Sequence, residues 1–307
     1  MKRNVLITGG SGGLARFVAE ELKTTMEVTL FDIVSPSESR VPWETDLKFV
    51  KGDLTDLADC MRAVTLAQAD TIVHLGAIPY CTDQQPGHHP NFRMPQRLPE
   101  DTTMKVNVMG TYYIMDAARR LGVKKIIFAS SFFTLGLGFR ISDKPFEIDY
   151  LPIDENHRNQ PQDTYSLSKV IGEEIVHTYC RAYGMKGVAF RFMGISYPFR
   201  PHPNDIELPE RPNYPGFGSY QYADARDIAI ACRLAIEKDL ESEFESFFVI
   251  TDNQYRGSPR EAIEKSNPRF THLAGNLKDD EGIISDKKIK EMLGYESKYT
   301  WRKQTQE

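Results

Sequence analysis

The sequence predicts an α/β protein with a doubly wound parallel sheet and a small C-terminal subdomain. Short apolar and β-branched runs alternate with longer amphipathic segments along the chain. The short runs are apolar at nearly every position, which is typical of parallel strands that are buried on both faces. Helices between such strands cover both faces of the sheet, and ligands bind beyond the carboxyl ends of the strands.

Strands and helices can be assigned in chain order from these patterns. Seven segments have the composition of strands: 4–8, 27–32, 47–50, 71–77, 124–131, 187–192 and 247–252. The clearest helical patterns follow the fourth, fifth and sixth strands, at 102–121, 161–183 and 224–238. Two proline-rich segments, 78–100 and 197–222, come directly after the fourth and sixth strands. Long irregular segments inside a domain are usually functional, so we expect both at the ligand edge of the sheet.

Composition excludes several classes of partner. The 307 residues are 40% hydrophobic and 26% charged, as in ordinary globular proteins. A net charge of -5 and the lack of basic runs argue against a nucleic-acid partner. No apolar stretch has the length of a membrane span, and glycines interrupt the N-terminal apolar run before a signal sequence could form. We therefore expect a cytoplasmic protein with no membrane partner.

Cysteine and histidine spacing gives no metal site. The four cysteines, at positions 60, 81, 180 and 232, are far apart and form no CxxC pair, so we expect reduced and mostly buried thiols. His88 and His89 are adjacent, but no carboxylate or cysteine stands at ligand spacing from them. We interpret the two histidines as part of a solvated loop and predict no metal.

A glycine-rich turn follows the first strand. In "VLITGGSGGLARF", Gly9, Gly12 and Gly13 allow the backbone to approach a diphosphate at a helix N-terminus, with Leu14 beside it, although the same glycines could form a plain turn. Asp32 ends the second strand, where its carboxylate can bind both ribose hydroxyls of NAD and repel the phosphate of NADP. The predicted cofactor is NAD.

Tyr165 and Lys169 stand four residues apart in a segment with helical character. On a helix this spacing places both side chains on one face. A neighbouring ammonium favours the phenolate, which makes a tyrosine useful as an acid or base. The pattern alone also allows a half-buried tyrosine beside a solvated lysine.

Seven motifs appear in one order along the chain: "TGGSGGLA", "GDLTD" (52–56), "HLGA" (74–77), "NVMGT" (107–111), "FASSFFTLG" (128–136), "YSLSK" (165–169) and "RDIA" (226–229). With them the chain resembles the extended short-chain dehydrogenase/reductases, the NAD-dependent epimerase/dehydratase family. Some stretches look closer to uronate dehydrogenases. The resemblance implies a Rossmann fold, with residues 1–196 as the NAD-binding domain. The strand and helix near 224–252 would complete that domain, and 197–307 would form a discontinuous substrate-binding subdomain.

The same resemblance implies roles for individual residues. Tyr165 would be the general acid/base, and Lys169 would hold the nicotinamide ribose while lowering the pKa of the tyrosine. Ser131 would hydrogen-bond the substrate, with Ser130 as the alternative, and either serine could instead bond the backbone at a strand end. Asn107 would steady the lysine, unless it caps a helix or lies on the surface.

Other residues would contact the dinucleotide by the same resemblance. Asp53 and Leu54 would touch the adenine, and Leu75, Gly76 and Ala77 would line the cofactor. Asp53 could instead be a turn residue, and Gly76 and Ala77 could reflect tight packing. Helices at 102–121 and 161–183 would pair with their copies in a homodimer, as they do in the family.

The sequence departs from nucleotide-sugar enzymes of the family in two places. The asparagine expected after "FRF" is absent, and no arginine comes just after the glycines at 216 and 218. An arginine fork suits a diphosphate. Arg191, Arg200 or Arg211 could replace it, or be structural or solvated. Phe132 and Phe133, after the serine pair, indicate a more apolar substrate or another sugar pose, unless they belong to the core.

The leading functional hypothesis is an NAD-dependent oxidoreductase with a Ser-Tyr-Lys site. It would transfer hydride from a secondary hydroxyl or hemiacetal of a sugar or sugar-acid to NAD. The alternative is a nucleotide-sugar epimerase or dehydratase with transiently reduced NAD. A non-catalytic redox-sensing binder is the third hypothesis, and the complete residue set argues against it.

Overall fold

A seven-stranded parallel sheet forms the centre of the protein in a computed structural model, which describes residues 2–83, 98–138, 146–199, 221–254, 258–278 and 281–301. Its strands, in spatial order, are β3 (Lys48–Lys51), β2 (Glu27–Asp32), β1 (Asn4–Thr8), β4 (Thr71–His74), β5 (Lys125–Ser131), β6 (Lys186–Phe192) and β9 (Phe244–Val249). The chain runs outward from β1 to β3 and then returns to β4 on the other side of β1. The order therefore reverses between β1 and β4, where ligands of such sheets bind.

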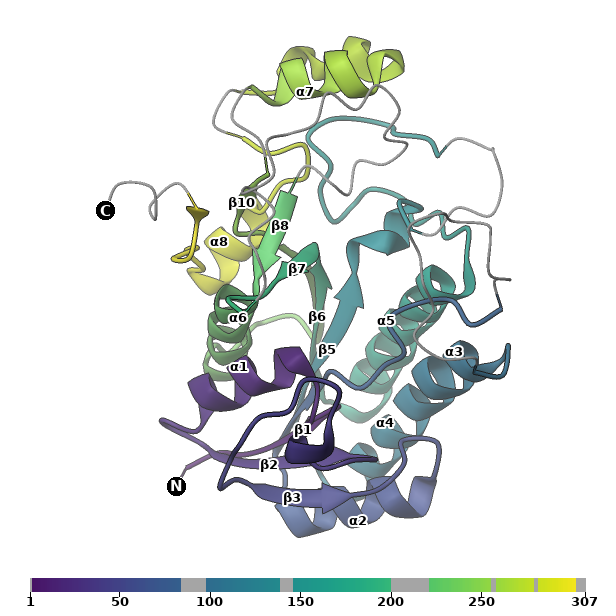
Figure 1. Ribbon diagram of the computed structural model, residues 1–307, viewed down its shortest axis with the longest axis vertical. Coiled ribbons are helices and arrows are strands. Elements are labelled where there is room, and N and C mark those ends of the chain that lie inside the picture. The colour runs from purple at the N-terminus through teal and green to yellow at the C-terminus, as the bar shows by residue number, and fades with distance from the viewer. Residues whose placement is uncertain are drawn as a thin grey trace.

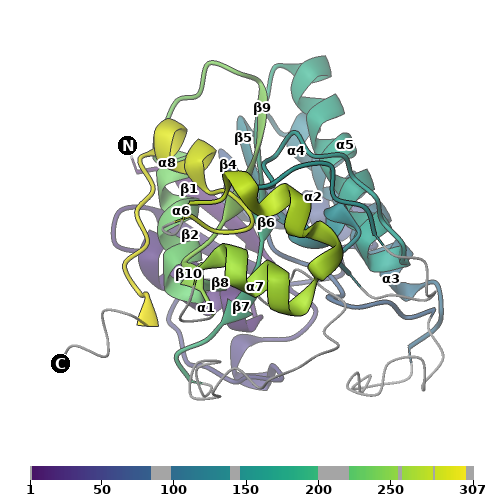
Figure 2. The ribbon, with the colours of Figure 1, turned by 90° about the horizontal axis from the view of Figure 1, so that it is seen from above.

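Helices cover both faces of this sheet, as Figures 1 and 2 show. One face carries α1 (Gly13–Leu22) and α6 (Ala225–Glu237), and the other carries α2 (Leu57–Ala67), α4 (Gly110–Arg120) and α5 (Thr164–Tyr183). Side chains alternate along each strand. On β1, Val5 and Ile7 belong to one hydrophobic core and Leu6 to the other. The predicted doubly wound α/β fold is confirmed.

The seven predicted strands and three predicted helices are present to within three residues at each end, and two differences have a structural cause. The helix expected at 102–121 is built from α3 (Thr102–Met104), a π-helical turn at Lys105–Met109 and α4. The last strand, expected at 247–252, begins at Phe244 because Phe244 pairs with Gly187 of β6. The residues at its start, Phe244–Ser246, are only half-buried, so the sequence there lacks the apolar run that predicts a buried strand.

A smaller sheet lies beyond the carboxyl ends of β5 and β6, together with α7 (Pro259–Ser266), as seen in Figure 1. Its strands are β10 (Asp252–Asn253), β8 (Gln221–Asp224) and β7 (Gly194–Ser196). The chain then forms α8 (Lys287–Leu293) beside α6.

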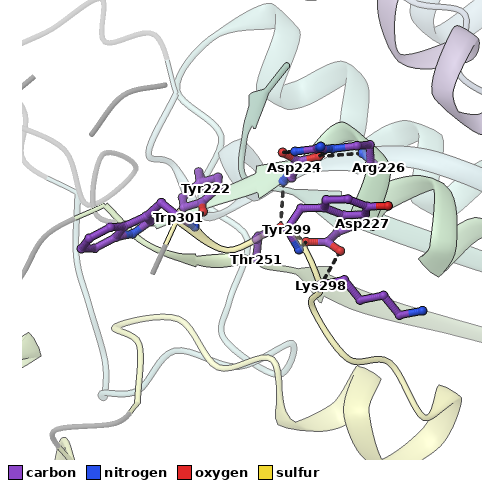
Figure 3. A network of polar contacts seen from close by, with 8 residues as sticks. All are labelled: Tyr222, Asp224, Arg226, Asp227, Thr251, Lys298, Tyr299 and Trp301. Atoms are coloured by element: carbon purple, nitrogen blue, oxygen red, sulfur yellow. Dashed lines mark hydrogen bonds and ion pairs between the residues drawn. The ribbon is translucent and has the colours of Figure 1, made fainter. Parts of the chain in front are cut away.

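Asp227 on α6 anchors the end of the described chain, as Figure 3 shows. Its fully buried carboxylate accepts hydrogen bonds from the backbone N–H of Lys298 at 2.8 Å and of Tyr299 at 3.2 Å. It also accepts one from the Thr251 hydroxyl at 2.8 Å. The "RDIA" motif thus joins α6 to the C-terminal segment.

All four cysteines are free and buried, as predicted. Within the described ranges, no helix combines the length and the apolar composition needed to span a bilayer. Nor do the described His, Cys, Asp and Glu side chains form a group of three that could hold a metal ion.

Candidate active site

The glycine-rich turn after β1 lies against the loop after β4. Gly9 has a positive φ of 65°, and a Cβ atom there would lie 2.6 Å from the Cα atom of Gly76. A Cβ atom on Gly76 would collide with the side chain of Leu54. Gly9 must therefore be a glycine for the two loops to meet, whereas a side chain at Gly76 would displace the end of the Leu54 side chain. Gly76 is thus tightly packed, as one of its two interpretations expected.

The N-terminus of α1 has a geometry that fits a diphosphate. Gly12 is the exposed N-cap residue, and no side chain caps the helix there. A Cβ atom on Gly13 would come no closer than 3.5 Å to another residue, the ring of Tyr197. Leu14, in contrast, is buried in the core. The first backbone N–H groups of α1 can therefore meet an anion without a side chain in the way.

Asp32 lies beside this turn, as the sequence predicts. Its carboxylate accepts hydrogen bonds from the backbone N–H of Ser11 at 3.0 Å and of Ile33 at 2.7 Å. Burial raises the pKa of Asp32, and these backbone N–H groups oppose the rise. The carboxylate is thus held at the end of β2, where a ribose would meet it.

The remaining predicted cofactor residues surround the same loops. Asp53 is exposed, and its carboxylate accepts hydrogen bonds from the backbone and hydroxyl of Thr55, both at 2.8 Å. The turn role weighed for Asp53 is therefore present, and its adenine contact stays a prediction. Leu54, Leu75 and Ala77 are half-buried, and the backbone N–H of Leu75 donates to the Thr8 carbonyl at 3.2 Å.

Ser131 and Tyr165 meet at the carboxyl end of β5. Their side chains are hydrogen-bonded to each other. The Ser131 hydroxyl also accepts a hydrogen bond from the backbone N–H of Phe133 at 3.2 Å. Ser130 points elsewhere and donates to Glu173. The structure therefore selects Ser131 over Ser130 as the partner of Tyr165.

Lys169 is buried, 5% exposed, on the same face of α5 as Tyr165. Its ammonium donates to the carbonyl of Ala129 at 2.8 Å and lies 5.7 Å from the centroid of the Tyr165 ring. Burial lowers the pKa of Lys169 to about 8, and Glu173 opposes this effect. The interpretation of Lys169 as a solvated lysine is wrong.

The expected effect of Lys169 on the pKa of Tyr165 stays a prediction. Burial raises the pKa of Tyr165 to about 12, and the hydrogen bond from Ser131 opposes the rise. The ammonium bonds the backbone of Ala129 and not the phenol oxygen. Desolvation of the phenolate is therefore the largest influence on the pKa of Tyr165 among the described residues.

Asn107 lies in the π-helical turn and is buried, 3% exposed. Its amide binds both backbone groups of Ile78, accepting from the N–H at 2.7 Å and donating to the carbonyl at 3.0 Å. It also donates to the hydroxyl of Ser168 at 3.0 Å, next to Lys169 in the chain. The surface role weighed for Asn107 is excluded, because the residue ties the loop after β4 to α5.

The two phenylalanines after the serine pair have different surroundings. Phe132 is buried in the hydrophobic core. Phe133 is half-buried and packs edge-on against the Tyr165 ring, with centroids 6.0 Å apart and an interplanar angle of 89°. The core interpretation therefore holds for Phe132, whereas Phe133 packs against the edge of the core and borders the Ser131 and Tyr165 hydroxyls.

Sequence reasoning missed two buried polar groups near the site. Glu173 pairs with Arg191, one of the three arginines considered for a diphosphate. His74 contacts the hydroxyl of Thr8 at 2.5 Å and that of Thr111 at 3.1 Å, and burial lowers the pKa of His74 to about 3. A charged residue inside an apolar strand, such as Arg191, was the feature of the sequence that could have indicated a buried ion pair.

His88, His89, Arg200 and Arg211 lie outside the described residues.

The glycine-rich turn at the switch point and the Ser131, Tyr165 and Lys169 side chains at the carboxyl edge of the sheet stand on a Rossmann-type α/β fold. The chain belongs to the NAD dependent epimerase/dehydratase family, whose model matches residues 5–208.

Individual relatives carry different names. The chain is 31% identical over 196 residues to a uronate dehydrogenase of Pseudomonas putida, covering 63% of this chain and 61% of the relative. It is 27% identical to a putative UDP-glucose 4-epimerase of Methanocaldococcus jannaschii, over 62% of this chain and 55% of the relative. The matches therefore span about six tenths of the length of these relatives.

A solved UDP-glucose 4-epimerase of Thermotoga maritima, in complex with UDP-glucose, has the same fold. Its TM-score is 0.68 at 20% identity, over 99% of this chain and 100% of the other.

Proposed function

We propose that this protein is an NAD-dependent oxidoreductase that oxidises a secondary hydroxyl or hemiacetal of a sugar or sugar-acid. The observation that carries the proposal is the hydrogen-bonded pair of Ser131 and Tyr165, with Lys169 on the same helix face. The likeness to a uronate dehydrogenase supports a sugar-acid as the substrate class.

The residues divide the chemistry between them. Once the Tyr165 phenol has released its own proton to solvent, the phenolate oxygen takes the proton of the substrate hydroxyl, and the Ser131 hydroxyl orients that oxygen through its own hydrogen bond. The Gly9–Gly13 turn and Asp32 hold the dinucleotide, which supplies the hydride acceptor when bound. Lys169 would bind the nicotinamide ribose, and its charge would favour the tyrosinate once the phenol ionises. Residues 1–196 with 224–252 would form the cofactor domain, and 197–307 the substrate subdomain.

The first experiment measures NADH absorbance after NAD is mixed with free sugars, hexuronates and UDP-, GDP- and dTDP-sugars. NADH should accumulate with a free sugar or sugar-acid. Tyr165→Phe should lose at least about a thousandfold in turnover, while Tyr183→Phe, on an exposed tyrosine of the same helix, should keep full activity. If Tyr165→Phe retained turnover with its fold and NAD binding intact, the assignment would be wrong.

A nucleotide-sugar epimerase or dehydratase is the second candidate, and the likeness to a putative UDP-glucose 4-epimerase favours it. It predicts converted UDP-sugar in the same tubes with no accumulated NADH. Against it, Arg191 is held by Glu173 and so is not available to bind a sugar diphosphate.

We also propose a homodimer through α4 and α5. These neighbouring helices expose large apolar side chains, with Tyr112 41%, Leu167 39% and Tyr183 53% exposed. Burying such a surface against a second copy is favourable. Light scattering should give twice the single-chain mass of 35.0 kDa. Tyr112→Glu should give monomers. Leu66→Glu, which changes the exposed surface of α2, should leave the dimer intact. A monomeric wild type would contradict the proposal.

We propose the cytoplasm as the location of the protein, because its four free thiols suit a reducing compartment.

A further inference from the structure

The buried network behind Lys169 carries a role in the active site. Tyr165, Lys169 and Glu173 are spaced by four residues on α5 and therefore lie on one face of the helix. The Glu173 carboxylate accepts two hydrogen bonds from Arg191, from Nε at 3.0 Å and from Nη2 at 2.8 Å. Both side chains of this ion pair are buried, with 5% of Arg191 and 8% of Glu173 exposed.

The network connects α5 to three strands of the main sheet. Ser130 of β5 also donates to Glu173, and it stands opposite Arg191 of β6 in the strand register. Arg191 continues to the carbonyl of Glu155 at 3.3 Å, and the Glu155 carboxylate accepts from the backbone N–H of Phe248 on β9 at 2.8 Å. Glu173 therefore cannot move without breaking contacts to the sheet.

We propose that Glu173, held in place by Arg191 and Ser130, is a positioning residue that keeps the Lys169 ammonium charged where it bonds the Ala129 carbonyl. This inference rests on the proposed function, which gives Lys169 the nicotinamide ribose as its partner. Because Lys169 is buried, water does not stabilise its charge, and a fixed carboxylate one turn away on the same helix does so.

The other groups around Lys169 leave this task to Glu173. His74 of β4 is neutral, since burial lowers its pKa to about 3. Ser130 and Ser131 of β5 carry no charge, and Tyr165 is protonated at neutral pH. The charge of Arg191 on β6 is paired with Glu173. Among the described residues packed around α5 near Lys169, Glu173 is the acidic group that raises the pKa of Lys169.

The test measures the dissociation constant of NADH between pH 6 and 10 by nicotinamide fluorescence. In the wild type, affinity should fall as Lys169 loses its proton, with a midpoint near pH 8. Glu173→Gln removes the charge and keeps the shape, and should lower this midpoint by about one pH unit while affinity at pH 6 stays unchanged. Glu174→Gln, which removes the same charge from the exposed neighbour on α5, should leave the midpoint in place.

Two results would overturn the proposal. The first is a loss of NADH affinity in Glu173→Gln that is equal at every pH, because it would indicate a merely structural role. The second is an unchanged midpoint of the pH dependence of NADH affinity in the same variant. If Glu173→Gln does not fold, Glu173→Asp is used instead, because it retracts the carboxylate by one methylene. It should lower the midpoint by roughly half a pH unit, and an unchanged midpoint in Glu173→Asp would also overturn the proposal. NADH binding needs no substrate, so failure of the proposed reaction would appear separately, as an absence of turnover with normal NADH titration.

Discussion

Replacing Asp227 with alanine should release the C-terminal segment before the rest of the protein unfolds. The carboxylate of Asp227 receives three hydrogen bonds, two of them from the backbone N–H groups of Lys298 and Tyr299, as Figure 3 shows. Hydrogen bonds to a charged group are worth roughly 1.5 kcal/mol or more each. Burial raises the pKa of Asp227, so removing the charge recovers part of this energy. We expect a net loss of about 3 kcal/mol for Asp227→Ala, and about half of that for the isosteric Asp227→Asn.

Tryptophan fluorescence can separate this local release from global unfolding. The chain has two tryptophans, Trp43 and Trp301. Trp301 is buried in the C-terminal segment, where its backbone N–H donates to the Tyr222 hydroxyl at 3.1 Å. In a Trp43→Phe background, the emission of Trp301 should shift to the red about 1 M earlier in urea for Asp227→Ala. Circular dichroism at the same urea concentrations should still report a folded sheet.

The matched control is Glu237→Gln, which removes one charge from an exposed position of the same helix. It should leave the Trp301 transition within about 0.2 M of the parent. If Asp227→Ala behaved like this control, the carboxylate would not be the anchor of the segment, and the reasoning from its three hydrogen bonds would be refuted.

Two further predictions concern the active site. Lys169→Met should be more stable than the wild type at pH 7 by about 2 kcal/mol, because burial lowers the pKa of Lys169 from 10.5 to about 8 and the unfolded chain binds its proton more tightly. Between pH 8 and 10.5 the wild type gains stability and this advantage should disappear; urea midpoints that show no such convergence would contradict the buried charge. Phe133→Thr should shift the ratio of kcat/KM values about tenfold toward substrates with an additional hydroxyl beside the reacting carbon, because Phe133 offers such a hydroxyl no hydrogen bond. Phe133→Leu is the apolar control, and equal ratios in both variants would contradict a role of Phe133 in selection.

Local patterns were sufficient for the fold and for much of the site. Apolar strand runs, the glycines after the first strand and the four-residue spacing of Tyr165 and Lys169 are each readable within one element. The strand β9 was misplaced by three residues because its first half is only half-buried at the edge of the sheet. The sequence could not show that Phe132 enters the core while Phe133 packs against Tyr165. A short turn directs neighbouring side chains in ways that neither helical nor strand periodicity predicts.

The sequence alone determined which elements form and in which order, because periodicity, turn glycines and helix spacing act over short stretches of chain. It also determined that Tyr165 and Lys169 share a helix face. Only the tertiary structure decided that Ser131 and not Ser130 meets Tyr165, and that Arg191 is paired with Glu173. It also decided the direction of the pKa changes of Tyr165 and Lys169. Those outcomes depend on burial and on contacts between strands and helices far apart in the chain, and such contacts have no signature in local spacing.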